Sequence, residues 1–340
     1  MQRIHFFCIL FMLVILMPLT GDMAEERSIP ILYTTDLYHP PDDPDDHFDL
    51  ATLFAMPEFD ILAVVIDRGE RGAERPGIIP LKQLMHMTGR EIPFAYGLID
   101  NLISTEDTAG SQIEMNQTGV RLILDSLENA TRPVTIFTTG SLRDVAVAYN
   151  RTPELFHEKV SRLYINAGHS SGREEWNVKL DPRAYVCMMR SRLPIYWVPC
   201  FGDKGYSSFW KFKQSQILDH CSLALQNYVV YALTKEKPEL HDPIPALSLP
   251  ISDETKEKIW NLERSMWCTA AFLHAAGRTN PTFTFKKMPV QIDDEGVTHI
   301  TTEEKGISIH TIYREDVDAY SRSMRESLRR LLMHLKTVQE

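Results

Sequence analysis

From Pro30 onward, short apolar runs alternate with longer segments in which apolar residues recur at helical spacing. Runs that are apolar along nearly their whole length are typical of strands buried on both faces, as in parallel sheets. Their alternation with helices predicts an α/β fold: one domain with an open, mostly parallel central sheet and helices on both faces. The predicted strands are 31–35, 61–66, 92–95, 134–138, 162–166 and 195–198.

The pattern changes after Phe201 and becomes more helical. Helical spacing predicts helices over 222–234 and 256–276, and a packed terminal helix over 315–336. Between the last two lies a terminal hairpin with predicted strands 282–286, 297–301 and 307–312, and Asp294, Glu295 and Gly296 supply a turn.

The first residues differ from the rest of the chain. Arg3 precedes an apolar run over 4–19, and the acidic Glu25 and Glu26 follow it. This pattern is typical of a signal peptide, and the run is shorter than the ~20 residues that span a bilayer. A cleavable signal over 1–24, ahead of a domain over 25–340, is favoured over a membrane anchor. The expected product is exported, periplasmic or secreted, and free of the membrane after cleavage.

Charge and cysteine content exclude some classes of function. The formal net charge is −10, so the sequence shows no obvious basic surface that would neutralise the backbone of a nucleic-acid polymer. A small-molecule ligand fits better. Cys187, Cys200, Cys221 and Cys268 match neither zinc-site spacing nor a small disulfide scaffold, and buried thiols are the favoured interpretation.

An acidic cluster follows the first predicted strand. Five carboxylates, those of Asp36, Asp42, Asp43, Asp45 and Asp46, fall within eleven residues. Any one of them is explained by capping of the helix that begins there, but capping does not need all five. Crowded carboxylates repel one another unless a cation is present, and hard oxygen ligands select calcium or magnesium. The cluster therefore predicts a metal site.

Three weaker signals follow later strands and a helix. Thr139 and Gly140 end the fourth strand, where a backbone carbonyl could complete a calcium shell, although such residues are common in turns. Glu175 and Asn177, two residues apart on a segment expected to be extended, could bind sugar hydroxyls or belong to a solvated loop. The dipeptide 241–242, His-Asp, is either a surface turn or an acid beside a metal ligand.

The order and spacing of these segments resemble the inosine-uridine preferring nucleoside hydrolases. The resemblance covers nearly the whole mature chain and rests on segments 31–36, 45–46, 57–58, 133–140, 175–182 and 241–243. It implies the nucleoside hydrolase fold, with a Rossmann-like sheet, and calcium-dependent hydrolysis of the N-glycosidic bond of nucleosides to free base and ribose.

The resemblance also implies roles for single residues. Asp36, Asp46, Asp242 and the carbonyl of Thr139 would bind Ca²⁺, and Asp36 would take the proton from a metal-bound water. Asp45, Glu175 and Asn177 would bind the ribose hydroxyls. His241 would lie near the leaving base and protonate it.

The chain departs from the family pattern in two places. Thr34 replaces an expected Asp, and eight residues, 37–44, separate Asp36 from the paired aspartates where the family has three. Asp42 or Asp43 is an alternative to Asp36 at the metal, and the longer loop is expected to form a wall of the pocket. The sequence 67–70, Asp-Arg-Gly-Glu, stands where the family has an Asn that contacts ribose.

The resulting prediction is an exported N-glycosyl hydrolase whose partner is a small nucleoside, and the sequence leaves a homo-oligomer open. Trp176, Phe209 and Trp210 are candidates to stack on a base, although core positions are the more common role of such aromatics. The alternative prediction is an altered-substrate or non-catalytic calcium-dependent protein of the same fold that binds ribosyl compounds or sugars. An aspartyl phosphatase is disfavoured, because Thr34, Thr35 and Leu37 offer no second Asp beside Asp36.

Overall fold

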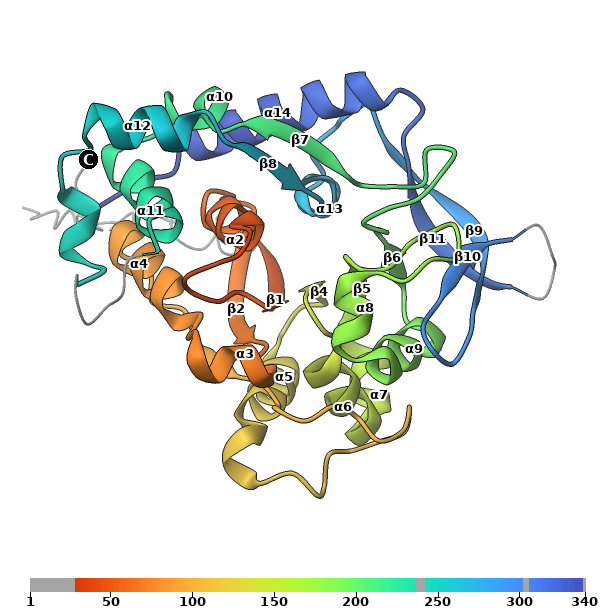
Figure 1. Cartoon of the computed structure of the whole chain (residues 1–340). Coiled ribbons are helices and arrows are strands. Elements are labelled where there is room, and N and C mark those ends of the chain that lie inside the picture. The colour runs from red at the N-terminus through yellow and green to blue at the C-terminus, as the bar shows by residue number, and fades with distance from the viewer. Residues whose placement is uncertain (1–27, 236–241, 302–305, 339–340) are drawn as a thin grey trace, which may run out of the picture.

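A computed structural model describes residues 28–235, 242–301 and 306–338 of the chain. The predicted signal segment 1–24 and His241 lie outside the described residues. One large sheet runs through the middle of the molecule (Figure 1). Its nine strands lie in the order β10-β9-β11-β6-β5-β4-β1-β2-β3.

Seven neighbouring strands of this sheet, from β11 to β3, are parallel, and β9 and β10 continue the sheet in antiparallel fashion. The predicted open, mostly parallel sheet is confirmed. Its strands are β1 (Ile29–Thr35), β2 (Phe59–Ile66), β3 (Phe94–Tyr96), β4 (Val134–Thr139), β5 (Val160–Ile165), β6 (Ile195–Trp197), β9 (Thr284–Ile292), β10 (Thr298–Ile300) and β11 (Ile307–Tyr313).

Alternate side chains of the strands enter two separate cores, because successive residues of a strand point to opposite faces. Ile31 and Tyr33 of β1 pack in one core, and Leu32 packs in the other. Both cores are apolar and buried. This two-sided burial explains why the strands read as nearly continuous apolar runs.

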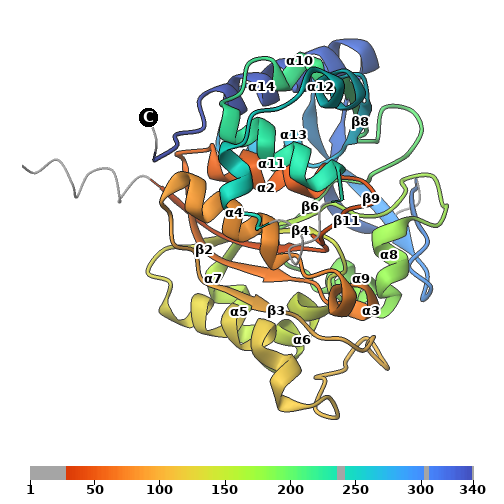
Figure 2. The ribbon, with the colours of Figure 1, turned by 60° about the vertical axis from the view of Figure 1, so that its left-hand side comes forward.

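Helices cover both faces of the sheet, as Figure 2 shows from a second direction. The first core is closed by α2 (Asp45–Phe54), α4 (Ile78–Thr88), α10 (Ser215–Leu218), α11 (Leu223–Leu233), α12 (Asp253–Trp260), α13 (Thr269–Ala275) and α14 (Val317–Met333). The second is closed by α5 (Thr118–Asn129), α6 (Arg143–Arg151), α7 (Pro153–Lys159) and α9 (Pro182–Arg190). The short helices are α3 (Gly69–Glu74), α8 (Trp176–Leu180), η1 (Glu114–Gln117) and η2 (Pro245–Ser248).

Several predictions about the C-terminal half are confirmed and one is wrong. The three hairpin strands, the helix at 222–234 and the terminal helix are present. The predicted helix over 256–276 is instead α12, strand β8 (Glu263–Met266) and α13. β8 pairs with β7 (Trp210–Lys213) in a second, two-stranded sheet, and these ladder hydrogen bonds replace the helical ones. The four cysteines of the described chain are free and buried, as predicted.

The strand order places the ligand site. β2 and β3 lie on one side of β1, whereas β4, β5 and β6 lie on the other, so the direction of winding reverses between β1 and β4. Ligands of open α/β sheets bind outside the carboxyl ends of the strands at this reversal. Asp36 directly follows β1, and Gly140 directly follows β4. Among the described residues, no helix is long and apolar enough to cross a membrane.

Candidate active site

A cavity of about 460 Å³ lies at the carboxyl edge of the sheet, where the winding reverses. We call it the acidic cavity. It is lined by Asp36, Tyr38, Asp42, Asp43, Asp45, Asp46, Thr139, Glu175, Trp176, Asn177, Cys200, Phe201 and Trp267. The structure thus brings together most of the residues that the sequence singled out, although they come from distant parts of the chain.

Asp46 is held by two hydroxyl groups. Its Oδ1 accepts a hydrogen bond from Thr35 Oγ1 at 2.9 Å and from Thr139 Oγ1 at 3.0 Å. Thr139 Oγ1 also lies 2.8 Å from the hydroxyl of Tyr33. Because Thr35 ends β1 and Thr139 ends β4, these bonds fix the carboxylate over the point where the two strands meet.

Asp36 lies against Asp46 and the turn after β4. Burial raises the pKa of Asp36 well above its usual range, and the charges of Asp46 and Asp67 raise it further. A Cβ on Gly140 would lie 2.6 Å from the backbone nitrogen of Asp36, so only glycine allows this approach. A carboxyl group with a raised pKa is suited to act as a general base near neutral pH.

The other acidic residues of the cluster have distinct surroundings. Burial and the charges of Asp46 and Asp43 raise the pKa of Asp45 well above its usual range. Asp42 is bound by Arg75 at 2.9 Å, and Asp43 is bound by Arg264 at 3.0 Å. These two carboxylates are therefore neutralised by arginines, which weakens them as alternatives to Asp36. The loop 37–44 does line the cavity, through Tyr38, Asp42 and Asp43.

The predicted extended segment at 175–177 is wrong, although both of its polar residues line the cavity. Glu175 is the N-cap of α8, and its carboxylate accepts from the N–H groups of Gly168, Asn177 and Val178 at 2.8–3.3 Å. A side chain that caps a helix satisfies donors that have no helical partner, and this stabilises the helix start. Asn177 donates from Nδ2 to the carbonyl of Asn166 at 3.2 Å.

The cavity offers hard oxygen donors of the kind that calcium and magnesium prefer, namely Asp36, Asp46 and the Thr139 segment. Burial raises the pKa of Asp46 as well, against the hydrogen bonds from Thr35 and Thr139. A cation would relieve this crowding, so the donor chemistry fits the metal that the sequence predicts. In the described residues, however, no three Asp, Glu, His or Cys groups already form a metal-binding arrangement.

Asp242 is the predicted ligand that the structure does not bring to the cavity. It is exposed, its Oδ1 accepts from Ile244 N at 3.0 Å, and it is not among the residues lining the cavity. The adjacent Pro243 accepts from Gln83 of α4 at 2.8 Å, which ties this turn to the helix layer. The predicted acid His241 lies outside the described residues.

Three aromatic side chains, those of Trp176, Phe201 and Trp267, also line the acidic cavity. Trp176 and Phe201 are 50% and 40% exposed, so their rings are open to a ligand. Phe201 packs edge-on against Trp267 at 5.8 Å between ring centroids. Of the three aromatic residues that the sequence suggested for stacking, Trp176 lines the cavity, whereas Trp210 is in the core.

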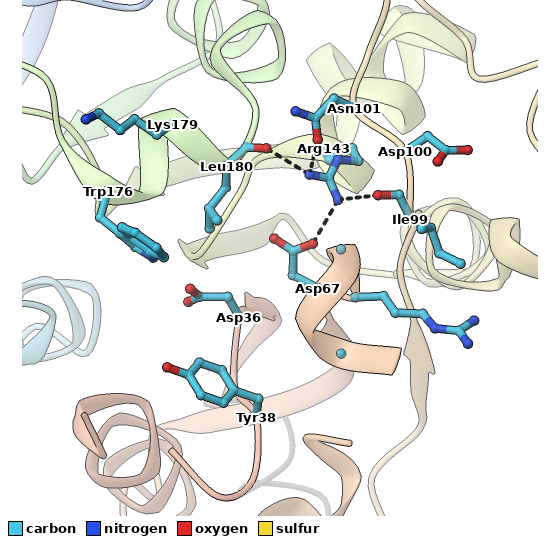
Figure 3. A pocket seen from close by; sticks show the side chains of 13 residues that line it. Asp36, Tyr38, Asp67, Ile99, Asp100, Asn101, Arg143, Trp176, Lys179 and Leu180 are labelled. Carbon is cyan, nitrogen blue, oxygen red and sulfur yellow. Dashed lines mark hydrogen bonds and ion pairs between the residues drawn. The ribbon is translucent and has the colours of Figure 1, made fainter. Parts of the chain in front are cut away.

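A second cavity, of about 480 Å³, adjoins the first, and we call it the Arg143 cavity (Figure 3). Asp36, Tyr38 and Trp176 line both cavities. Asp67, at the end of β2, lines only the second, where its Oδ1 accepts from Arg143 at 3.2 Å. Its Oδ2 accepts from Ser141 N at 3.0 Å, so the first residue of the stretch 67–70, which stands where the family has an Asn, is engaged within the protein.

Three residues of these cavities, Arg143, Asn101 and Phe201, belong to no motif in the sequence. Arg143 begins α6, at a position where a negative residue is favoured by the helix dipole. That mismatch is the one signal of an internal partner for this arginine. Asn101 and Phe201 lie in loops whose composition carries no comparable signal.

Comparison with known proteins identifies the family. The model of the inosine-uridine preferring nucleoside hydrolases matches residues 39–322. The pyrimidine-specific ribonucleoside hydrolase RihA of Escherichia coli O1:K1 / APEC is 29% identical over 189 residues, or 49% of this chain and 59% of that protein. RihA of Escherichia fergusonii is 28% identical over the same shares. The chain thus matches less than two thirds of the length of these curated relatives.

Solved structures support the fold. A plant nucleoside hydrolase, PpNRh1, aligns over 90% of this chain and 99% of its own, with a TM-score of 0.59 and 15% identity. A purine-preferring ribonucleoside hydrolase from Gardnerella vaginalis aligns over 89% and 99%, with a TM-score of 0.56 and 15% identity. These likenesses confirm the nucleoside hydrolase fold. Together with the match over 39–322, they show that the chain belongs to the inosine-uridine preferring nucleoside hydrolase family, whose members are hydrolases of N-glycosyl bonds.

Proposed function

We propose that the protein is an exported, calcium-dependent nucleosidase that hydrolyses the N-glycosidic bond of ribonucleosides to free base and ribose. The observation that carries the proposal is the acidic cavity, which gathers Asp36, Asp45 and Asp46 at the reversal point of the sheet. The family match supports the reaction class. The apolar run 4–19 near the N-terminus supports export.

The chemistry of the bond explains why carboxylates are needed. As the C–N bond breaks, positive charge develops on the ribose ring, and the base leaves with the bonding electron pair. Water oxygen bonds to the anomeric carbon, one proton of that water passes to Asp36, and the base takes up a proton. The neighbouring carboxylates favour the cationic sugar, because fixed charges in a sheltered cavity stabilise charge that develops in the transition state.

Calcium is the proposed cation, held by Asp36, Asp46 and the carbonyl of Thr139. When bound, it would supply Lewis acidity that makes water a stronger nucleophile at neutral pH. Protein calcium sites use six to eight oxygens, so these three residues would supply only part of the ligands, and the sequence-predicted ligand Asp242 lies outside the lining of the cavity. Asp45, Glu175 and Asn177, which line the same cavity, are proposed to bind and orient the ribose hydroxyls.

His241 is the proposed acid that protonates the leaving base, and this proposal rests on the sequence alone. Its proposed role is testable because proton donation matters most when the leaving group is poor. His241→Ala is expected to lower turnover of inosine far more than turnover of a nitrophenyl riboside, whose phenolate leaves without a proton. Equal losses on the two substrates would contradict the role.

A second candidate function is binding of ribosyl compounds without turnover. It is favoured by the exposed position of Asp242 and by the engagement of Asp67 with Arg143. Both features remove contacts that the family pattern assigns to the metal or the ribose. Release of base distinguishes the two candidates.

The deciding experiment is a nucleoside panel, assayed with and without a chelator, in which free base and free ribose are both measured. We expect equimolar base and ribose, loss of both after chelation, and recovery with added calcium. Tight binding of nucleosides with no release of base would favour the binding protein. Full activity after exhaustive chelation would contradict the calcium requirement.

A further inference from the structure

The Arg143 cavity has no part in the proposed ribose contacts, yet it opens directly beside them. Asp36, at which hydrolysis is proposed, lies on the boundary between the two cavities, together with Tyr38 and Trp176. A nucleoside has two parts joined at the bond to be cut. Two adjoining cavities that meet at the proposed general base could each hold one of these parts, with the bond to be cut at their boundary.

We propose that the Arg143 cavity binds the base of the substrate, and that Asn101 recognises the carbonyl oxygen that uracil carries at C4 and hypoxanthine at C6, where cytosine and adenine carry an amino group. This inference rests on the proposed nucleosidase function for the identity of the ligand. It assigns a specificity-determining residue that neither the family match nor the sequence indicates.

Arg143 holds together the segments that form the walls of the cavity. Its side chain is 3% exposed and pairs with Asp181 at 3.0 Å and with Asp67 at 3.2 Å. It also donates to the carbonyls of Leu98, at 3.1 Å, and Leu180, at 2.9 Å. One buried guanidinium thus joins the end of β2, the start of α6, the loop after β3 and the end of α8.

Asn101 is oriented by the same guanidinium. Arg143 Nη2 donates to Asn101 Oδ1 at 2.7 Å, so the amide oxygen is engaged. Figure 3 shows that oxygen facing Arg143 and the amide nitrogen turned away from it. A primary amide has one acceptor oxygen and two N–H donors. With its oxygen held, this exposed side chain offers the cavity donors only, and the matching ligand group is an acceptor.

The walls suit a flat, partly apolar ring. Ile99 and Leu180 contribute apolar surface, and the half-exposed Trp176 contributes an aromatic face. Uracil and hypoxanthine combine such a ring with carbonyl oxygens. As the base leaves, negative charge spreads onto these oxygens, so a fixed N–H donor binds the departing base more strongly than the intact nucleoside.

The decisive variant is Asn101→Asp, which keeps an acceptor oxygen for Arg143 and removes the two donors. We expect kcat/KM for uridine and inosine to fall about tenfold relative to cytidine and adenosine, the effect of ~1.4 kcal/mol. Asn101→Leu, which removes the donors without adding charge, should give the same change of preference. Asn129→Asp, an exposed change of equal charge on α5, serves as the matched control.

Binding of free uracil and hypoxanthine, measured by calorimetry, separates this inference from the proposed function. A wild-type protein that releases no base from any nucleoside contradicts the nucleosidase, whereas weaker base binding by both Asn101 variants still supports the subsite. Unchanged base binding, or an equal loss of kcat/KM on all four nucleosides, overturns it. A change of base preference with Phe201→Leu and none with the Asn101 variants would assign the base to the acidic cavity beside Phe201 instead.

Discussion

At the scale of single residues, Asp46 differs from the other carboxylates because two hydroxyls hold one of its oxygens. We predict that Asp46→Asn folds but loses at least ~100-fold in activity, since even outer partners of a metal ligand are worth 10–100-fold. Metal content after dialysis and the rate of base release give the measurement.

Asp42→Asn is the matched control for Asp46→Asn. Asp42 also lines the acidic cavity, but it is exposed and paired with Arg75. We expect this variant to keep its metal and most of its activity. A comparable loss in both variants would mean that Asp42 serves the cation, and the assignment of Asp46 would then have to change.

Asp144 makes stability depend on pH. Burial and the charge of Asp67 raise its pKa to about 7, although Arg143 opposes this. In the unfolded chain its pKa is ~3.9, so between about pH 4 and pH 7 the folded state retains a proton that the unfolded state has lost. The contribution of this carboxyl group to stability therefore falls as pH rises through that window.

We predict that Asp144→Asn is more stable than the wild type at about pH 8, by roughly 1–4 kcal/mol, and equal to it near pH 4. The neutral amide keeps an oxygen to accept from Leu98 N, as Asp144 does at 3.1 Å. Urea unfolding at several pH values measures the difference. A difference that stays constant with pH would assign it to packing instead of charge.

The candidate site was predictable where a residue's position depends on one strand alone. Asp36, Thr139 and the pair Asp45-Asp46 follow predicted strands, and the carboxyl ends of parallel strands meet at one edge. The Arg143 and Asn101 pair joins segments far apart in the chain, and no local pattern encodes that contact. The place of the predicted ligand Asp242 could not be inferred from the strands, because Asp242 follows a helix. The adjacent Pro243 is bound by Gln83 of α4.

At the scale of elements, the loop 37–44 is the feature most specific to this chain. Asp42 pairs with Arg75, and Asp43 pairs with Arg264 of β8. We predict that Arg75→Ala combined with Arg264→Ala raises KM severalfold, because the loop loses the two ion pairs that fix its position beside the cavity. The exposed Asp42–Arg75 pair contributes only about 0–1 kcal/mol, so most of any fall in melting temperature should come from Arg264, whose side chain is 13% exposed.

Arg329→Ala provides the control for loop anchoring. Arg329 forms a partly exposed ion pair with Glu326 on α14, and neither residue lines a cavity described above. Its loss should leave KM unchanged. If the double loop variant fails to fold, or changes kcat with KM constant, the loop is not the wall that the geometry indicates.

Prediction of the elements succeeded where burial sets the pattern. Strands buried on both faces have apolar sequences, and all six of the predicted parallel strands are present. The segment 256–276 has apolar residues at helical spacing, yet Glu263–Met266 pairs with Trp210–Lys213. Pairing between segments some fifty residues apart overrides local preference, and spacing alone cannot reveal it.

At the scale of the whole molecule, a cation in the acidic cavity should stabilise the fold. The proposed ligands follow β1, begin α2 and end β4, so one ion would link two strands of the central sheet and one helix that covers it. A ligand that binds only the folded state adds stability of about 2.7 kcal/mol at 100 times its Kd. For a domain of this size, that is a rise of several degrees in melting temperature.

We therefore predict that calcium raises the melting temperature of the wild type, that a chelator reverses the rise, and that Asp46→Asn shows none. Magnesium should stabilise less, because it demands near-ideal octahedral geometry and gives up its waters reluctantly. Scanning calorimetry of the full chain at a series of calcium concentrations measures the effect without reference to activity. An equal rise in Asp46→Asn would locate the ion outside the acidic cavity, and no rise in the wild type would contradict a calcium site in this fold.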